Sequence, residues 1–241
     1  MTVKPALEAL GYEIRLADRS TADGRYGSMR PSATYTPWNV DAEFQRVFTL
    51  ARHNTLADIY RCYELWSLVG QVAHLPGAYL EVGVWNGGTG SVIARRARLT
   101  SPGASVYLCD TFSGVVKADS EDTCYKGGEH RDASKAAVER LLAKVEASAT
   151  ILEGVFPDDT AALIPEQPFR FCHIDVDVHR SAKETTEWVW PKMPIGGVVV
   201  YDDYGFFGCD GVRSYVDTQI GQPDRVVVYN LNGHGVIVKT A

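Results

Sequence analysis

Alternation between short β-rich runs and helical stretches is the feature that most constrains the fold of this chain. After Pro76-Gly77, runs rich in β-branched and aromatic residues recur with helix-compatible stretches between them. The runs are AYLEVGVW (78–85), SVYLCDTF (105–112), ATILEGVF (149–156), FRFCHIDVD (169–177) and GGVVVYDDY (196–204), and the helical stretches are 90–99, 133–148 and 182–190. This alternation predicts βαβ units and a largely parallel sheet, the α/β class.

The chain closes with two further β-rich runs, RVVVYNL (225–231) and GVIVKT (235–240). Between them lies Asn232-Gly233-His234, which is typical of a tight turn. These residues predict a hairpin of two final strands. Such an ending is less usual for a plain dinucleotide-binding fold.

The region before residue 77 has a different character. Residues 1 to about 40 are rich in Ser, Thr, Gly and Pro and predict an irregular leader. From Asp41 onward apolar residues recur at helical spacing, and Thr55 with Asp58 resembles a capping box that begins a second helix. We expect one folded unit, with residues 1–76 as a leader and helical lid region and residues 77–241 as the α/β core.

Composition argues against several function classes. Charged residues throughout the first 20 positions interrupt the apolar run that a signal peptide or membrane span needs, which predicts a cytoplasmic protein without a membrane anchor. Five cysteines without a C-x-x-C pair suggest neither a zinc site nor a disulfide framework. A formal net charge of −6 disfavours nucleic acid as a partner, so a small-molecule substrate is expected. A homo-oligomer is left open.

A glycine-rich loop follows the first run, where an open α/β sheet binds its ligand. The sequence EVGVWNGGTG (81–90) permits a tight turn and close approach of the backbone to a ligand. Its spacing is G-x-x-x-G-G, and Trp85 stands where a dinucleotide fingerprint has its second glycine. The loop therefore favours a cofactor without phosphates, unless its glycines only shape a strand-to-helix turn.

The second strand is expected to end at Asp110, where a carboxylate can accept hydrogen bonds from both hydroxyls of a ribose. Together with Glu81 and the glycine loop, Asp110 describes a pocket for a nucleoside joined to an amino acid. Residues 154–156 (GVF), beyond the third strand, would border the adenine. The alternative interpretation of Asp110 is a solvated loop acid.

Four aspartates gather at the ends of the fourth and fifth runs. Residues two apart on a strand face the same side, so Asp175 and Asp177 are expected to point together. If the fifth strand is adjacent, Asp202 and Asp203 would meet them, and a divalent cation between three of the four would relieve their repulsion. All-oxygen ligation suits Mg²⁺ or Mn²⁺. The alternative is a set of separately solvated acids.

These residues resemble the macrocin-type sugar O-methyltransferase family, whose members methylate sugar hydroxyls of antibiotics and related natural products. The resemblance runs from Thr36 onward. It is carried by YRCYELW (60–66), EVGVWNGGTG (81–90), DTF (110–112), YKGGEH (125–130), HIDVD (173–177) and DDYGFFGC (202–209). It implies S-adenosylmethionine as methyl donor and a Rossmann-like class I methyltransferase fold, a seven-stranded sheet that ends in an antiparallel hairpin.

The resemblance also assigns roles to residues. Asp175, Asp202 and Asp203 match the family's metal ligands, and Asp177 matches its proposed general base. Some members are thought to use a histidine just after this motif, which keeps His179 as a second candidate, although a lone histidine there is usually a surface or packing residue. The expected cofactor-binding residues are Glu81, Gly83, Val84, Trp85, Gly87, Gly88, Thr89, Ser91, Asp110, Thr111, Ser113, Gly154, Val155 and Asp175.

The predicted activity is metal-dependent transfer of a methyl group from S-adenosylmethionine to a hydroxyl of a (deoxy)sugar on a natural product. The alternatives are a catechol-type phenol O-methyltransferase and a non-catalytic cofactor-binding protein. A nicotinamide-dependent dehydrogenase is a third, weakened by Trp85. A segment from about Lys117 to Arg131 and the polar leader are the expected lids, since lids are drawn from long irregular segments.

Overall fold

The computed structural model describes residues 24–27, 29 and 33–241. Residues Ala33–Ala241 form one compact unit. The predicted leader falls largely outside the described residues, so its irregular structure and the lid role of residues 1–76 stay predictions. The same holds for the cytoplasmic location, which was inferred from the first 20 positions.

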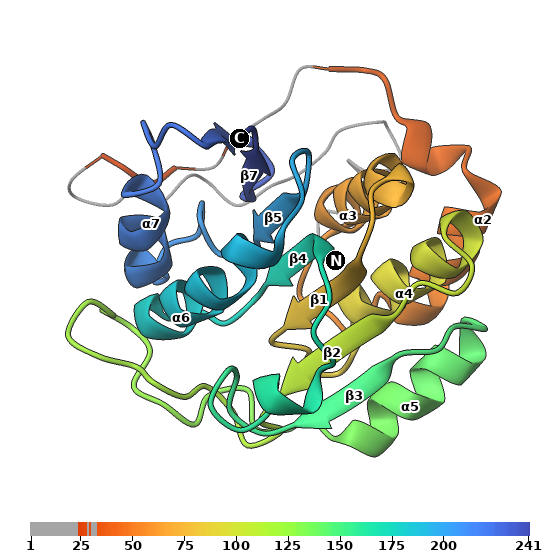
Figure 1. Cartoon of the computed structure of the whole chain (residues 1–241), viewed down its shortest axis with the longest axis horizontal. Helices are drawn as coiled ribbons and strands as arrows, with labels where there is room; N and C mark the ends of the chain where they lie inside the picture. Colours follow the sequence, from red (N-terminus) through yellow and green to blue (C-terminus); the bar gives the residue numbers. More distant parts are fainter. Residues whose placement is uncertain (1–23, 28, 30–32) are drawn as a thin grey trace, which may run out of the picture. The chain divides into compact units, whose positions relative to one another are not determined.

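A seven-stranded sheet forms the centre of this unit (Figure 1). Its order is β3-β2-β1-β4-β5-β7-β6; the first five strands in this order are parallel, and β7 is antiparallel to both of its neighbours. This confirms the predicted α/β sheet and its C-terminal hairpin. The strands are β1 (Ala78–Val82), β2 (Val106–Asp110), β3 (Thr150–Glu153), β4 (Phe169–Ile174), β5 (Val198–Tyr201), β6 (Arg225–Tyr229) and β7 (Gly235–Lys239).

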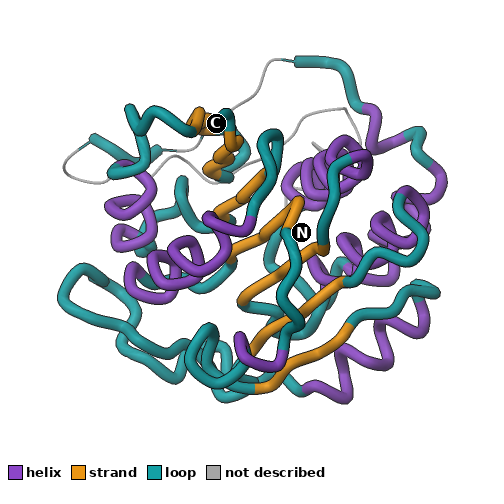
Figure 2. Tube along the Cα trace, viewed as in Figure 1, coloured by secondary structure: helices purple, strands orange, loops and turns teal. Residues whose placement is uncertain are grey.

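Helices cover both faces of the sheet (Figure 2). Apolar residues of α3, α4 and α5 pack on one face, and those of α6 and α7 pack on the other. Helix α2 packs outside α3 and α4 in a third apolar cluster. The α-helices are α2 (Ala42–Ala51), α3 (Ile59–Gln71), α4 (Gly88–Thr100), α5 (Lys135–Lys144), α6 (His179–Val189) and α7 (Asp210–Asp217); the 3₁₀ turns are η1 (Pro37–Asn39), η2 (Val72–His74), η3 (Ala161–Leu163) and η4 (Trp190–Lys192).

Helix α3 begins three residues later than a capping box at Thr55 would place it. Its N-cap is Asp58, whose carboxylate accepts hydrogen bonds from the backbone N–H groups of Tyr60 and Arg61. Thr55 instead accepts a hydrogen bond from the Ala57 N–H in the preceding turn. The predicted capping box is therefore wrong, because Asp58 satisfies the free N–H groups of the first helical turn by itself.

Every predicted run from β1 to β5 extends past the carboxyl end of the observed strand. In the first run the backbone turns at Gly83, with φ of +87°. In the fourth run β4 ends at Ile174, so residues 175–177 are not part of the strand. The polar and glycine-rich segments that carry the predicted site are thus loops at one edge of the sheet.

In the part of the chain that the structure describes, no helix combines the length and apolar composition that crossing a bilayer requires.

The turn at Gly83 leads to a stability prediction. A Cβ atom at this position would lie 1.6 Å from the carbonyl oxygen of Asp175, whereas Gly103, with a similar φ of +91°, has nothing within 4 Å of that point. Both alanine variants place a side chain in the left-handed region, at a cost of about 1–2 kcal/mol. Gly83→Ala should lose a further ~1–3 kcal/mol through overpacking, measured by urea denaturation. Equal losses in the two variants would contradict the steric explanation.

Candidate active site

A cavity of about 400 Å³ opens at the carboxyl ends of β1, β2, β4 and β5. This is the edge at which a parallel α/β sheet binds ligands. The walls come from residues 54–57 and Arg61, from the loops after these strands, and from part of the 111–130 segment. The cavity therefore joins parts of the chain that are far apart in sequence.

Eight of the predicted cofactor residues line the cavity, and six do not. The lining residues are Gly83, Val84, Trp85, Thr89, Asp110, Thr111, Gly154 and Asp175. The remaining residues, which lie off its wall, are Glu81, Gly87, Gly88, Ser91, Ser113 and Val155. Gly88 and Ser91 are buried in α4, where the helix packs against the molecule, and Ser113 faces solvent.

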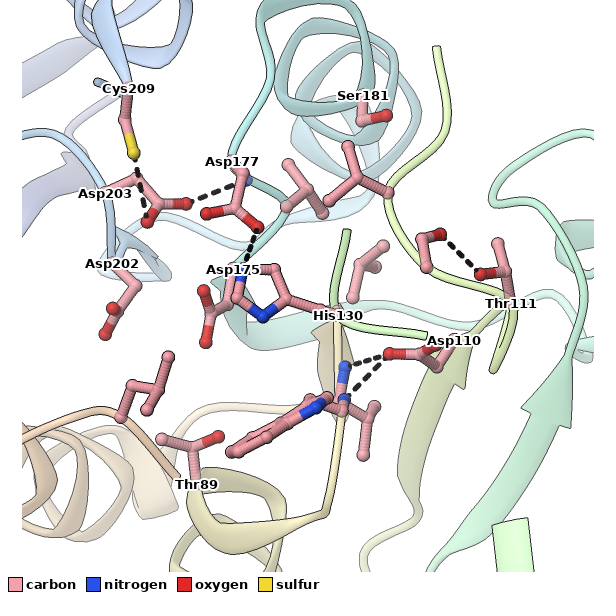
Figure 3. A pocket seen from close by; sticks show the side chains of 18 of the residues that line it. Thr89, Asp110, Thr111, His130, Asp175, Asp177, Ser181, Asp202, Asp203 and Cys209 are labelled. Atoms are coloured by element: carbon pink, nitrogen blue, oxygen red, sulfur yellow. Dashed lines mark hydrogen bonds and ion pairs between the residues drawn. The ribbon is translucent and has the colours of Figure 1, made fainter. Parts of the chain in front are cut away.

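Asp110 holds the glycine loop in place. One carboxylate oxygen, Oδ2, accepts hydrogen bonds from the backbone N–H groups of Val84, at 2.6 Å, and Trp85, at 2.8 Å. The other, Oδ1, accepts from the Phe112 N–H at 2.6 Å. Figure 3 shows two of these bonds running from Asp110 to the turn after β1. Asp110 is thus a structural anchor as well as a cavity residue.

Glu81 lies beneath the site rather than in it. Its side chain is fully buried and its Oε1 lies 2.8 Å from Nδ1 of His173. Burial raises the pKa of Glu81 against the opposing effect of this contact. Because a Cβ on Gly90 would lie 2.5 Å from its Oε2, Glu81 points under the start of α4 and not toward the cavity.

Three aspartates converge at the opposite end of the cavity (Figure 3). Asp175 follows β4, and Asp202 and Asp203 follow the adjacent strand β5. One carboxylate oxygen from each lies within 4.8 Å of the others. The two strands are adjacent, as the hypothesis of a shared cation site required, and the three carboxylates are close enough together to be candidates for such a site.

Asp177 lies near these three aspartates, but its backbone conformation differs from the predicted strand. It lies beyond the end of β4 and has a φ of +64°, so the alternation of side chains along a strand does not apply to it. Its backbone N–H donates to Oδ2 of Asp203 at 2.9 Å. This left-handed turn, and not the pleat of a strand, brings the Asp177 side chain to the cavity wall.

The carboxylates repel one another in this buried setting. Burial raises the pKa of Asp175, and the charges of Asp202 and Asp203 raise it further. Burial likewise raises the pKa of Asp203, with Asp177 and Asp202 adding to the effect. Because a divalent cation would remove this repulsion, the donor set fits a hard ion such as Mg²⁺ or Mn²⁺.

Asp202 differs from the other acids because basic side chains surround it. Burial opposes its ionisation, but contacts with His173 and His234 and the charge of Arg61 outweigh burial and hold its pKa below the usual range. Arg61 forms a buried ion pair with Oδ2 of Asp202. Neither Arg61 nor His234 was singled out from the sequence.

His179, the second candidate base, lies outside the cavity, whereas His130 lies inside it. His179 is the first residue of α6 and does not line the cavity; its Nδ1 lies 3.8 Å from Oδ2 of Asp119, and its ring packs against Tyr215. His130 does line the cavity, and its Nε2 lies 4.0 Å from Oδ2 of Asp177 (Figure 3). The structure thus brings His130 to the proposed base, whereas it places His179 outside the cavity.

Tyr125 completes the surroundings of Asp177. It lines the cavity, shares a hydrogen bond with the Asp177 carboxylate, and its ring lies 6.1 Å from that of His130. Both residues belong to the YKGGEH stretch (125–130) within the expected lid. That motif carried the resemblance but gave no residue a role, and its position beside the aspartates could not be read from spacing.

Comparison with known families decides the classification. A family model described as Macrocin-O-methyltransferase (TylF) matches residues 51–221, which is more than half of the chain. The chain belongs to this family. The matched region includes the glycine loop and all five aspartates of the cavity, which are Asp110, Asp175, Asp177, Asp202 and Asp203.

Two curated relatives from Streptomyces resemble this macrocin O-methyltransferase family member. The 8-demethyl-8-(2,3-dimethoxy-alpha-L-rhamnosyl)-tetracenomycin-C 4'-O-methyltransferase of Streptomyces olivaceus is 32% identical over 155 residues, 58% of this chain and 58% of that protein. The demethyldecarbamoylnovobiocin O-methyltransferase of Streptomyces niveus is 29% identical over 162 residues, 62% of this chain and 59% of that protein. The chain therefore spans about three fifths of the length of these relatives.

Among solved structures, the O-methyltransferase NovP has a TM-score of 0.65 and 23% sequence identity. The match covers 78% of this chain and 82% of NovP. At this identity the likeness shows the fold alone, and it agrees with the predicted class I methyltransferase sheet.

The contacts of Asp110 predict a stability effect without any cofactor. An asparagine there would place an amide N–H₂ against a backbone N–H donor, leaving a donor unpaired at a cost of about 1–3 kcal/mol. Asp110→Asn should therefore lower the free energy of unfolding of the cofactor-free protein in urea. Glu139→Gln, on an exposed residue of α5, is the control and should show no change. An unaffected Asp110→Asn protein would mean that Asp110 serves the ligand only.

Proposed function

We propose that the protein transfers a methyl group from S-adenosylmethionine to a hydroxyl of a sugar carried by a natural product. We further propose that the reaction uses Mg²⁺ or Mn²⁺ held by Asp175, Asp202 and Asp203. The observation that carries the proposal is the convergence of these carboxylates, within 4.8 Å of one another, in the same cavity as the glycine loop. Family membership and the rhamnosyl group named in one relative support it.

The cofactor would lie between the glycine loop and the residues that follow β2 and β3. Gly83, Thr111 and Gly154 line this part of the cavity and leave room for a ligand close to the backbone. An ionised carboxylate has about four acceptor positions, and Asp110 uses three of them within the protein. One position on Oδ1 remains for a ribose hydroxyl.

A neutral alcohol is a poor nucleophile and needs activation. When bound by the three aspartates, a divalent cation would lower the pKa of the hydroxyl and orient its oxygen. Asp177 would accept the proton, since burial raises the pKa of its carboxyl despite the hydrogen bond from Tyr125, and a higher pKa makes it a stronger base. Tyr125 and the Asp203 carboxylate would keep Asp177 oriented.

One experiment distinguishes the proposed sugar methylation from two alternative functions. A catechol-type enzyme would use the same cofactor and metal on planar phenols, and a cofactor-binding protein would show no turnover. Mass spectrometry of a panel of glycosides and phenols, incubated with the protein, S-adenosylmethionine and Mg²⁺, tests all three. Gain of one methyl group on the sugar of a glycoside supports the proposal. Methylation confined to phenols would overturn the sugar assignment.

Removal of the metal should separate catalysis from cofactor binding. EDTA should abolish turnover and Mg²⁺ or Mn²⁺ should restore it. Asp202→Asn should lose turnover yet bind S-adenosylhomocysteine in calorimetry, because the proposed metal and cofactor positions occupy different parts of the cavity. Glu139→Gln, on an exposed residue of α5, is the matched control. Full activity in exhaustive chelator would rule out metal catalysis.

The proposed base can be distinguished from the metal ligands. Asp177→Asn keeps the shape but removes the proton acceptor, so kcat should fall by about 10²- to 10⁴-fold while Mn²⁺ affinity changes little. His179→Ala should leave kcat nearly unchanged, since His179 lies outside the cavity. If Asp177→Asn weakens Mn²⁺ binding as much as Asp175→Asn does, Asp177 is a ligand and His130 becomes the next candidate base.

A further inference from the structure

The tight turn between β6 and β7 is attached to helix α3 through Glu64. Three side chains of the turn contact this carboxylate: Nδ1 of His234 at 2.6 Å, Nδ2 of Asn232 at 2.6 Å, and Nδ2 of Asn230. The turn is also bonded internally, since the His234 N–H donates to Oδ1 of Asn232 at 2.9 Å. Glu64 thus fixes both the turn and the direction of the His234 ring.

The other edge of that ring faces Asp202, which lines the cavity. His234 is fully buried, and its Nε2 lies 2.9 Å from Oδ1 of Asp202. Glu64, which is partly buried, and the buried residues His234 and Asp202 therefore form a continuous chain from α3, through the C-terminal turn, to the residue that follows β5. A carboxylate–histidine–carboxylate chain of this kind restricts the rotation of its last member.

The turn also packs against Phe206, which contacts Arg61, the residue paired with Oδ2 of Asp202. Phe206 lies over the Arg61 guanidinium, 4.5 Å from its carbon to the ring centroid. A Cβ on Gly233 would lie 2.3 Å from that ring, so Phe206 is packed directly against the turn. Both oxygens of Asp202 are consequently held by groups whose positions depend on residues 230–234.

We propose that His234 and Glu64 are positioning residues for Asp202, and that the C-terminal turn sets the orientation of this carboxylate for the divalent cation. The proposal rests on the proposed metal site and deepens it, because neither residue touches the cation or the substrate. Partners of this kind typically affect metal affinity by about 10- to 100-fold. We therefore expect that Asp202 binds the cation at full affinity only when the contact between Glu64 on α3 and His234 in the turn is intact.

Two substitutions at one position test the link. In His234→Gln the side-chain amide reaches the place of Nε2 and keeps the contact with Asp202, whereas in His234→Asn the amide reaches only the place of Nδ1 and keeps Glu64. His234→Asn should raise the Kd for Mn²⁺, measured by calorimetry on the full chain, by about 10- to 100-fold. His234→Gln keeps the contact with Asp202 but loses the contact with Glu64, so it should raise the Mn²⁺ Kd less than His234→Asn does, by about tenfold, and the S-adenosylhomocysteine Kd should not change in either variant.

The control is His74→Asn, on an exposed histidine of η2, which should bind Mn²⁺ as wild type does. Wild-type Mn²⁺ affinity in His234→Asn would overturn the positioning role while leaving the metal site intact. If circular dichroism finds the His234 variants unfolded, Glu64→Gln replaces them; it should raise the Mn²⁺ Kd about tenfold, and an unchanged Kd would overturn the proposal. Absence of Mn²⁺ binding by wild type itself would overturn the metal site, and this inference with it.

Discussion

Repulsion among buried carboxylates is the constraint on which the rest of the site depends. Adjacent parallel strands β4 and β5 end at the same edge of the sheet, so the acids that follow them cannot move apart without breaking the sheet. Their burial weakens the screening that water would provide. The basic side chains around Asp202 offset part of this negative charge in the protein alone. The proposed cation would offset the rest.

Basic side chains of the protein offset the negative charge of Asp202 more fully than that of Asp175 or Asp203. Asp202 has Arg61 on one oxygen and His234 on the other, with Nε2 of His173 3.6 Å away, whereas burial and neighbouring acids raise the pKa of Asp175 and Asp203. Its neighbours thus stabilise the negative charge of Asp202, whereas the charges of Asp175 and Asp203 are left to repel those around them. At the proposed metal site, a cation would then have to neutralise only part of the total charge.

The sequence was informative about the sheet and less so about contacts across it. Alternating β-rich and helical stretches predicted the five parallel strands, and two further β-rich runs around a turn predicted the C-terminal hairpin, because hydrophobic periodicity is a local property. The position of the carboxylates at one edge followed from strand topology. By contrast, Arg61 and Asp202 are separated by 141 positions and His234 and Glu64 by 170, and no local pattern joins such pairs. The burial of Glu81 beneath α4, off the cavity wall, likewise depends on packing across the sheet that no local pattern reveals.

The position of β7 couples the last part of the chain to the chemistry of its middle. This strand lies between β5 and β6, so β5 has an open edge until residues 235–239 are available. During synthesis the four aspartates emerge well before that strand, and His234 emerges with it. An incomplete chain would thus hold its acids without one of the groups that restrains them and with an unpaired strand edge beside them, a feature that promotes aggregation. Closure of the sheet and completion of the surroundings of Asp202 therefore depend on the same segment of the chain.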